Sequence, residues 1–293
     1  MSPFYKLTYI IVILLAPVVL KAQQDQFTIE AGPEYRREDF RWSIAGTKQG
    51  TNPNILSELI FKPINAAGFF VKGQYKPVEN FSVDIHYNKL WTYKGSVTDF
   101  DYDGDNRTNP VTKLYLQSNE GGMRTAGMDL NYKVYNSPDL SVLAGAGLSL
   151  TKELFYLTDD LDPLLRSTYE ATWNGPGLHL KGLYNKRLFN AGAALKYSYL
   201  FYNATADWNL VETFQHPVSF THKAKANAFD GSISAGVQAT PSFGINLHGL
   251  FSFWKTGYGV DKLYETTGVV YEARLNGAIN KSFGLRLTGT FTF

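Results

Sequence analysis

Four carboxylates lie within seven residues of the sequence, at Asp99, Asp101, Asp103 and Asp105. Together with Gly104 they match the front half of a calcium-binding loop, where acidic residues at positions one, three and five converge because glycine at position six permits a sharp turn. The acidic residue usual at position twelve is missing, since Pro110 stands there. The cluster therefore allows two interpretations, a calcium site or an acidic loop exposed to water.

The histidines offer a second kind of chemistry. His86, His179 and His248 each alternate with apolar neighbours, which predicts that they point toward a polar interior. There they more often complete hydrogen-bond networks than bind a metal. The chain has no cysteine, so thiol catalysis, disulfides and a lipid-modified cysteine are excluded. It also lacks a phosphate-binding loop and a nucleophile elbow.

The end of the sequence indicates which elements position these residues. Residues 283–293 alternate strictly, with Leu285, Leu287 and Phe291 on one face and Arg286, Thr288 and Thr290 on the other. A strand with one apolar and one polar face, closed by a final Phe293, is typical of the signal that the barrel assembly machinery of the bacterial outer membrane reads. We therefore predict an outer-membrane location, with membrane lipid as a partner.

The start of the sequence agrees with this location. Lys6 precedes an apolar run, residues 7–20, that is too short to span a bilayer, which takes about 20 residues. We predict an export signal over residues 1–22 and a single mature domain over residues 23–293. The net charge of +2 and the absence of basic runs with interleaved aromatic residues give no indication of nucleic-acid binding.

Period-two alternation recurs along the whole mature chain, for example at 81–88, 128–134 and 243–249. Turn-forming clusters separate long strand pairs; they lie at 76–80, 136–139, 184–186 and 240–242. Four such turns predict an all-β, up-and-down antiparallel transmembrane barrel of ten strands. A further turn at 279–283 would make the count twelve. Such a narrow barrel is largely filled by side chains, which argues against an open pore.

Longer polar stretches alternate with these turns and are predicted to be extracellular loops. They cover residues 46–54, 99–110, 158–167, 206–217 and 256–267. In this interpretation the four aspartates, together with His216, lie in loops at the extracellular end.

Several segments resemble the omptins, a family of ten-stranded outer-membrane aspartyl proteases. Residues 55–73 are similar to the family's second strand, whose Leu-x-Trp-Lys-x-x-Asn-Ala-Ala core here has Phe61 in place of Trp. Residues 99–102 (Asp-Phe-Asp-Tyr) resemble the first catalytic segment, residues 176–199 the sixth and seventh strands, and residues 239–241 the fourth periplasmic turn. The resemblance covers most of the mature chain.

The resemblance implies a site with two walls. Asp99 and Asp101 match the family's paired aspartates, and the family's Asp-x-His pair falls on Asp207 and Asn209. Because an amide cannot accept a proton at neutral pH, Asn209 would leave water activation without its base. His216 or His222 would replace that base if the loop folds back.

Other specialised omptin positions also differ. The carboxylates that hold a basic substrate side chain fall on Phe40 and Thr205, although Glu38 and Asp39 lie close by, and the arginine that binds a lipid A phosphate falls on Thr172. We therefore expect an omptin-like barrel that lacks standard proteolysis and uses its loops to contact an extracellular protein or peptide. The alternatives are an altered endopeptidase using Asp99, Asp101 and Asp207, and a calcium-binding barrel. Lipopolysaccharide is a further possible ligand.

Overall fold

The computed structural model describes residues 26–293, and the predicted export signal at 1–22 lies outside them and stays a prediction. The described chain consists almost entirely of antiparallel strands, with one short 3-10 turn, η2 (Asp105–Arg107). The strands are β1 (Phe27–Ile44), β2 (Ser57–Val78), β3 (Phe81–Lys94), β4 (Ser96–Gly104), β5 (Thr108–Gln117), β6 (Gly121–Asn136), β7 (Leu140–Thr158), β8 (Arg166–Lys186), β9 (Phe189–Asp207), β10 (Phe220–Thr240), β11 (Phe243–Thr256), β12 (Gly259–Tyr264) and β13 (Val270–Thr292).

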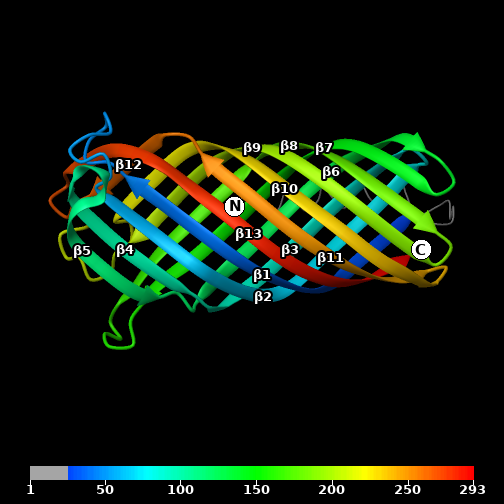
Figure 1. Cartoon of the computed structure of the whole chain (residues 1–293), viewed down its shortest axis with the longest axis horizontal. Helices are drawn as coiled ribbons and strands as arrows, with labels where there is room; N and C mark the ends of the chain where they lie inside the picture. The colour runs from blue at the N-terminus through cyan, green and yellow to red at the C-terminus, as the bar shows by residue number, and fades with distance from the viewer. Residues whose placement is uncertain (1–25) are drawn as a thin grey trace, which may run out of the picture.

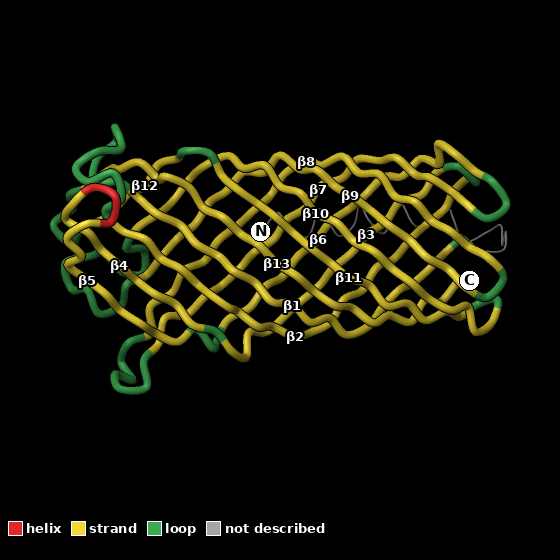
Figure 2. Tube along the Cα trace, in the orientation of Figure 1, coloured by secondary structure: helices red, strands yellow, loops and turns green. Residues whose placement is uncertain are grey.

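These segments close into a ring of ten antiparallel strands (Figure 2). Three members of the ring are each built from two successive segments, β3 with β4, β5 with β6, and β11 with β12. The ring closes because β1 pairs with β2 on one side and with β13 on the other. The predicted all-β barrel of ten strands is confirmed. Within the described residues, no helix is long and apolar enough to cross a membrane.

The alternative count of twelve strands is wrong. Residues 279–283 lie inside β13 and pair continuously with both β1 and β11. The irregularity in this strand comes earlier, where the register between β1 and β13 shifts at Ser43 and Ile44. Gly277 lies opposite that shift with φ of 150°, a conformation that side-chain-bearing residues rarely adopt.

The tight turns and the C-terminal end of β13 lie at one end of the barrel, and β4, β5 and β12 lie at the other, which we call the barrel mouth (Figure 1). All four predicted periplasmic turns are present, but the turn predicted at 184–186 begins later. Residues 184–186 continue β8, and the turn itself consists of Arg187, with φ of 53°, and Leu188.

Two of the predicted extracellular loops are mostly strand. Residues 99–110 form the end of β4, the η2 turn and the start of β5, and residues 256–267 contain β12. The reason is strand length: β8 and β10 have 21 residues each, whereas a membrane-spanning strand needs about 9–11. The wall continues beyond the membrane, where polar residues such as the exposed Asp103 are compatible with a strand because the outer face can contact water.

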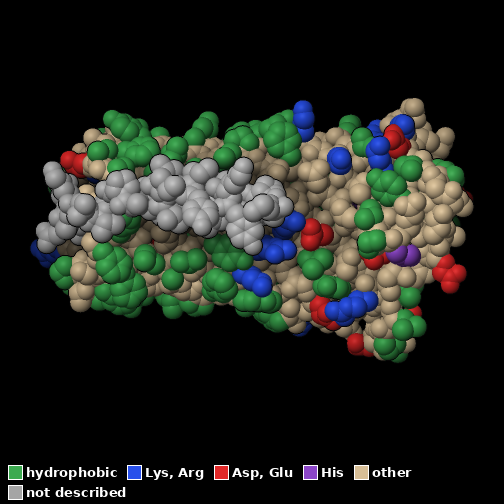
Figure 3. All heavy atoms as spheres, turned by 180° about the vertical axis from the view of Figure 1, so that it is seen from behind, with side chains coloured by type: hydrophobic (Ala, Val, Ile, Leu, Met, Phe, Trp, Pro, Cys, Tyr) green, Lys and Arg blue, Asp and Glu red, His purple; other side chains and the backbone are tan. Residues whose placement is uncertain are grey.

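The outer surface shows where the membrane ends. Apolar side chains point outward along the half of the barrel near the tight turns, for example Ile85, Leu178 and Ile233, which are 62%, 66% and 64% exposed. In Figure 3 most charged side chains gather over the half that carries the mouth. An apolar band bounded by polar residues is what lipid requires.

The lumen beneath the mouth is filled by a cluster of buried aromatic side chains, which we call the aromatic plug. It contains Phe40, Phe61, Phe155, Tyr169, Trp173 and Tyr202. The ring centroids of Phe40 and Phe155 are 5.2 Å apart, and those of Trp173 and Tyr202 are 4.3 Å apart. Together these rings occupy the interior on the mouth side of the membrane band.

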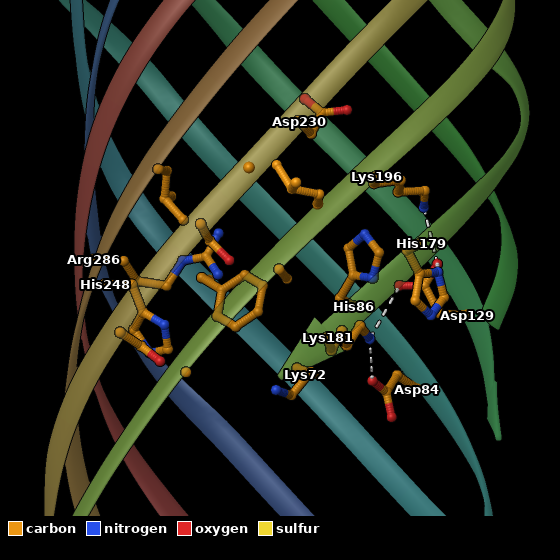
Figure 4. A pocket seen from close by; sticks show the side chains of 18 of the residues that line it. Lys72, Asp84, His86, Asp129, His179, Lys181, Lys196, Asp230, His248 and Arg286 are labelled. Carbon is orange, nitrogen blue, oxygen red and sulfur yellow. Dashed lines mark hydrogen bonds and ion pairs between the residues drawn. The ribbon is translucent and has the colours of Figure 1, made fainter. Parts of the chain in front are cut away.

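Below the aromatic plug the lumen is polar and holds a cavity of about 380 Å³ (Figure 4). Its charged side chains are largely paired: Lys181 Nζ lies 3.1 Å from Asp84 Oδ2, and Lys196 Nζ lies 2.9 Å from Asp129 Oδ1. His179 Nε2 and Asn131 Oδ1 are 2.8 Å apart, which supports a structural role for that histidine.

Candidate functional site

The first wall of the candidate site is the inner face of β4. Asp99 and Asp101 share this face, as expected for residues two apart on a strand. Asp99 is buried and pairs across the sheet with Leu59 of β2 and Leu114 of β5. Asp101 is partly exposed and pairs with Ser57 and Thr112. A rigid sheet therefore presents both carboxyl groups toward the barrel mouth, beyond the membrane band.

Burial raises the pKa of Asp99 to about 7; the negative charge of Asp101 acts in the same direction, and a hydrogen bond with the Trp208 side chain opposes it. The carboxyl group is thus largely protonated below neutral pH. Between about pH 4 and about pH 7 the folded protein holds a proton that the unfolded chain has released. Asp99 therefore makes the fold less stable as the pH rises through that window.

The second wall is the outer end of β9 and the segment that follows it. His216 Nδ1 lies 2.5 Å from Asp207 Oδ1, and both side chains remain partly open to solvent, at 37% and 27%. The Trp208 side chain connects the two walls, because it is next to Asp207 in sequence and close enough to Asp99 to lower the pKa of that carboxyl group. An imidazole held by a carboxylate is an arrangement suited to general-base catalysis.

The fold of residues 208–219 brings His216 back to Asp207. Gln215 N donates to Tyr264 O at 2.8 Å, and Ser219 N donates to Ala206 O at 2.8 Å. Ser219 Oγ also accepts a 2.9 Å bond from Trp208 N. The fold-back considered in the sequence analysis is therefore present, and it depends on backbone bonds to Ala206 and Tyr264 together with the Ser219 hydroxyl.

Asn209 points away from Asp207 and joins two loops. Its Oδ1 accepts bonds from Arg166 N at 2.9 Å and Ser167 Oγ at 3.1 Å, and its Nδ2 donates to Leu164 O at 2.8 Å. Asn209 thus connects the start of β8 to the segment that follows β9. It is the residue that the omptin resemblance aligns with the catalytic histidine. Its contacts are structural.

The four aspartates of the calcium pattern do not converge. They follow an extended strand and its turn, and Asp105 Oδ1 accepts a 2.7 Å bond from Asn54 N instead. Among residues 26–293, no three Asp, Glu, His or Cys side chains are arranged as metal ligands. Calcium binding by Asp99, Asp101, Asp103 and Asp105 stays a prediction that this geometry does not favour.

The remaining residues compared with omptins are mostly internal. His222 is fully buried, with Nε2 3.0 Å from Asp261 Oδ1 and Nδ1 2.8 Å from the Tyr169 hydroxyl, so it belongs to the packed interior. Phe40 lies in the aromatic plug, and Glu38 is buried below it. Thr205 lies on the exposed face of β9. None of these replaces the omptin pocket for a basic side chain.

Three cations lie side by side on the outer wall near the edge of the apolar band that faces the barrel mouth. Arg124 is the direct cross-strand partner of Lys89 on one side and of Lys152 on the other. These residues line an outer groove of about 370 Å³ that also contains Trp91 and Glu170. Within residues 26–293 only Lys152 of the three has an acidic partner, Glu170 at 3.3 Å. Two other carboxylates line the groove: Glu120 is paired with Arg166, and Glu153 is buried. Like charges placed opposite each other repel, so an anion near Arg124 would relieve the repulsion. We call it the cationic groove.

Fold and surface together define an outer-membrane β-barrel with a polar site at its mouth. The family model described as Pom, Protochlamydia outer membrane protein, matches residues 28–293, and the chain belongs to this family. Its location is the bacterial outer membrane. Among curated protein sequences, none matches this chain.

A solved structure with a TM-score of 0.75 supports the same fold. The outer membrane protease OmpT from Escherichia coli superposes with a TM-score of 0.75 at 15% identity, covering 94% of this chain and 99% of that one. The outer membrane protein OprG from Pseudomonas aeruginosa gives a TM-score of 0.42 at 9% identity, covering 92% and 97%. At this identity the likeness to OmpT shows the ten-stranded omptin-like fold and nothing about activity.

Proposed function

We propose that the protein is an outer-membrane endopeptidase with an altered omptin-like site, in which His216 serves as the base. The contact between His216 Nδ1 and Asp207 Oδ1 at 2.5 Å carries this proposal. It gives an imidazole held by a carboxylate, which can act as the base in place of the histidine that is missing at Asn209. In this proposal Asp99 and Asp101, on the inner face of β4, form the facing wall of the same site.

The chemistry follows from the protonation states. If Nδ1–H of His216 donates to Asp207, Nε2 is free to accept a proton from a bound water. The resulting hydroxide adds to a peptide carbonyl carbon, and protonated Asp99 stabilises the oxygen that becomes negative. The C–N bond then breaks, and His216 returns its proton to the departing amine.

The test is cleavage of peptides by the purified mature barrel in detergent with lipopolysaccharide. Unmodified protein should cleave, and Asp207→Asn should reduce kcat/KM about 100-fold or more because the imidazole loses its carboxylate partner. Asp139→Asn, in the turn at the opposite end, is the matched control and should have no effect. An inactive unmodified protein that is nevertheless correctly folded would contradict the proposal.

A second candidate function is recognition of an extracellular protein without proteolysis. The observation that favours it is the loop between β7 and β8, where Leu161 and Leu164 are 92% and 75% exposed beside Asp160 and Asp162. Exposed leucines at a loop tip are typical of contact surfaces. Absence of cleavage, with surface binding lost in Leu161→Ser, would favour this function.

We further propose that the cationic groove binds a phosphate group of lipopolysaccharide. The groove lies where the apolar band ends, which is the level of the lipid head groups. Arg124 occupies its centre, between Lys89 and Lys152. A phosphate there would relieve the repulsion between the three cations and make charge-assisted bonds to them.

Arg124→Glu should weaken binding of lipopolysaccharide by about tenfold or more, since one attractive contact becomes repulsive. Lys255→Glu is the matched control: it changes an outward cation of β11, whose cross-strand partners are the uncharged Asn227 and Ile279. Binding can be measured by lipid retention in detergent, with dephosphorylated lipid A for comparison. Equal losses in the two variants would mean that only net charge matters.

A further inference from the structure

One strand of the barrel wall has an unpaired edge. Residues 108–116 of β5 pair with β4 on one side, and the neighbouring β7 is reached only at Gln117, opposite Thr158. In the described part of the chain, β4 is the only strand to which backbone hydrogen bonds link residues 108–116. Asn109 has φ of 49° and Pro110 lacks an N–H, so the extended part of the free edge is residues 111–116, about 20 Å at roughly 3.3 Å per residue.

This edge is also exposed and apolar. Val111 and Tyr115 on its outer face are 68% and 74% exposed, and Leu114 on its inner face is 44% exposed. Native proteins usually cover, shorten or charge such an edge because it pairs readily with another chain. Here Pro110 and Lys113 provide only partial protection. The β4–β5 hairpin lies at the rim of the barrel mouth, where an extended segment can approach it (Figures 1 and 2).

The charges around the edge indicate what kind of chain fits. On the inner face, Asp99 pairs with Leu114 and Asp101 with Thr112. A strand added to β5 would lie two strand spacings, about 10 Å, from the partly exposed carboxyl group of Asp101, within reach of long basic side chains. Beyond Gln117 the β7–β8 loop carries Asp159, Asp160 and Asp162, and Asp160 Oδ2 accepts a 2.6 Å bond from Gln117 Nε2.

Nearby cations do not cancel this acidity. Arg107 is bound to Glu58, with Nε 2.8 Å from Oε1, and Arg166 is paired with Glu120. Lys113 lies on the outer face of β5, the face opposite to Asp99 and Asp101. The inner side of the edge is therefore acidic, and the outer side presents Val111 and Tyr115.

We propose that the free edge of β5 binds an extended peptide by strand addition, with alternate basic side chains facing the barrel mouth and apolar side chains facing outward. Backbone hydrogen bonds to β5 supply affinity, and the two faces supply specificity. The bound segment would run along β5 at the rim of the mouth, on the side of β5 away from β4. The inference thus deepens the proposed function, but binding is measured without cleavage, so the two can fail separately.

The probe is a capped ten-residue peptide of alternating Arg and Val, titrated into the His216→Gln protein in a zwitterionic detergent. Binding should slow amide hydrogen exchange within residues 108–116. An alternating Glu and Val peptide should bind at least tenfold more weakly. Unchanged exchange in β5 on peptide binding would overturn the proposal, because the contact would then lie elsewhere.

Backbone pairing is tested with two isomeric peptides, N-methylated on the Arg residues or on the Val residues. Alternate residues of a strand direct their N–H groups to opposite edges, so only one set of methyl groups blocks pairing. One isomer should bind like the parent, and the other at least tenfold more weakly. Equal affinity of the two isomers would overturn strand addition.

Charge is tested in the protein itself. Asp160→Lys should weaken binding of the Arg and Val peptide at least threefold, and Asp139→Lys at the opposite end should leave it unchanged. Equal losses would mean nonspecific attraction and overturn the charge argument. The particle mass without peptide should correspond to a monomer; a dimer disrupted by Val111→Lys would show that the edge pairs with a second copy instead.

Discussion

His216→Gln should lower kcat/KM for peptide cleavage by about 10²–10⁴-fold, the usual contribution of general-base catalysis. Glutamine keeps a group that can donate to Asp207 but cannot accept a proton from water at neutral pH. The loop should therefore keep its fold while the reaction loses its base. Initial rates on a fluorogenic peptide, with unfolding followed in parallel, measure both properties.

The control for this change is His86→Gln, which alters a histidine lining the lumen cavity, well below the mouth. Its activity should match that of the unmodified protein. Asn209→His is a second comparison: it should not raise activity, because it removes the bonds that Asn209 makes to Leu164, Arg166 and Ser167. Full activity in His216→Gln would mean that the contact between His216 and Asp207 only stabilises the loop.

Trp173→Ala should lower the free energy of unfolding by about 3–5 kcal/mol, the range for removing a large aromatic side chain from a core. Trp173 is 1% exposed and packs between Tyr202 and Trp254, with ring centroids 4.3 and 5.5 Å away. Its Nε1 also donates to buried Glu153 Oε2 at 2.8 Å. The substitution opens a cavity and removes the donor to Glu153 Oε2, while Asn280 Nδ2 still donates to Oε1 at 2.8 Å.

Urea unfolding in detergent micelles measures this effect. Trp91→Ala is the matched control, because Trp91 is 47% exposed on the outer wall, and its removal should change the stability by less than about 1 kcal/mol. Equal effects of the two substitutions would show that the aromatic plug contributes little to the stability of the barrel.

Strand alternation in the sequence predicts the half of the barrel that lies in the membrane. There the lipid on one side and a polar lumen on the other impose strict alternation, and residues 81–88 and 243–249 follow it. Above the membrane the outer face no longer has to be apolar. Asp99, Asp101 and Gly104 then have the composition of a loop while lying in a strand, which is why residues 99–110 were assigned wrongly.

Only part of the candidate site can be predicted from the sequence, for a related reason. Asp99 and Asp101 are neighbours in sequence, and a short motif indicates them. The pairing of Asp207 with His216 depends on backbone bonds to Tyr264 and Ala206, which no local pattern encodes. The omptin resemblance aligns a histidine with Asn209, two residues after Asp207, and the bond of Asn209 to the β7–β8 loop could not be inferred from residue type.

The aromatic plug has a consequence for the cell that carries this protein. Rings packed as closely as Phe61 and Phe155, with centroids 4.5 Å apart, fill lumen space on the mouth side that ions or small drugs would otherwise use. The barrel should therefore show no unit conductance in a planar bilayer. A cell can place many copies in its outer membrane and gain surface chemistry without adding a leak to its permeability barrier.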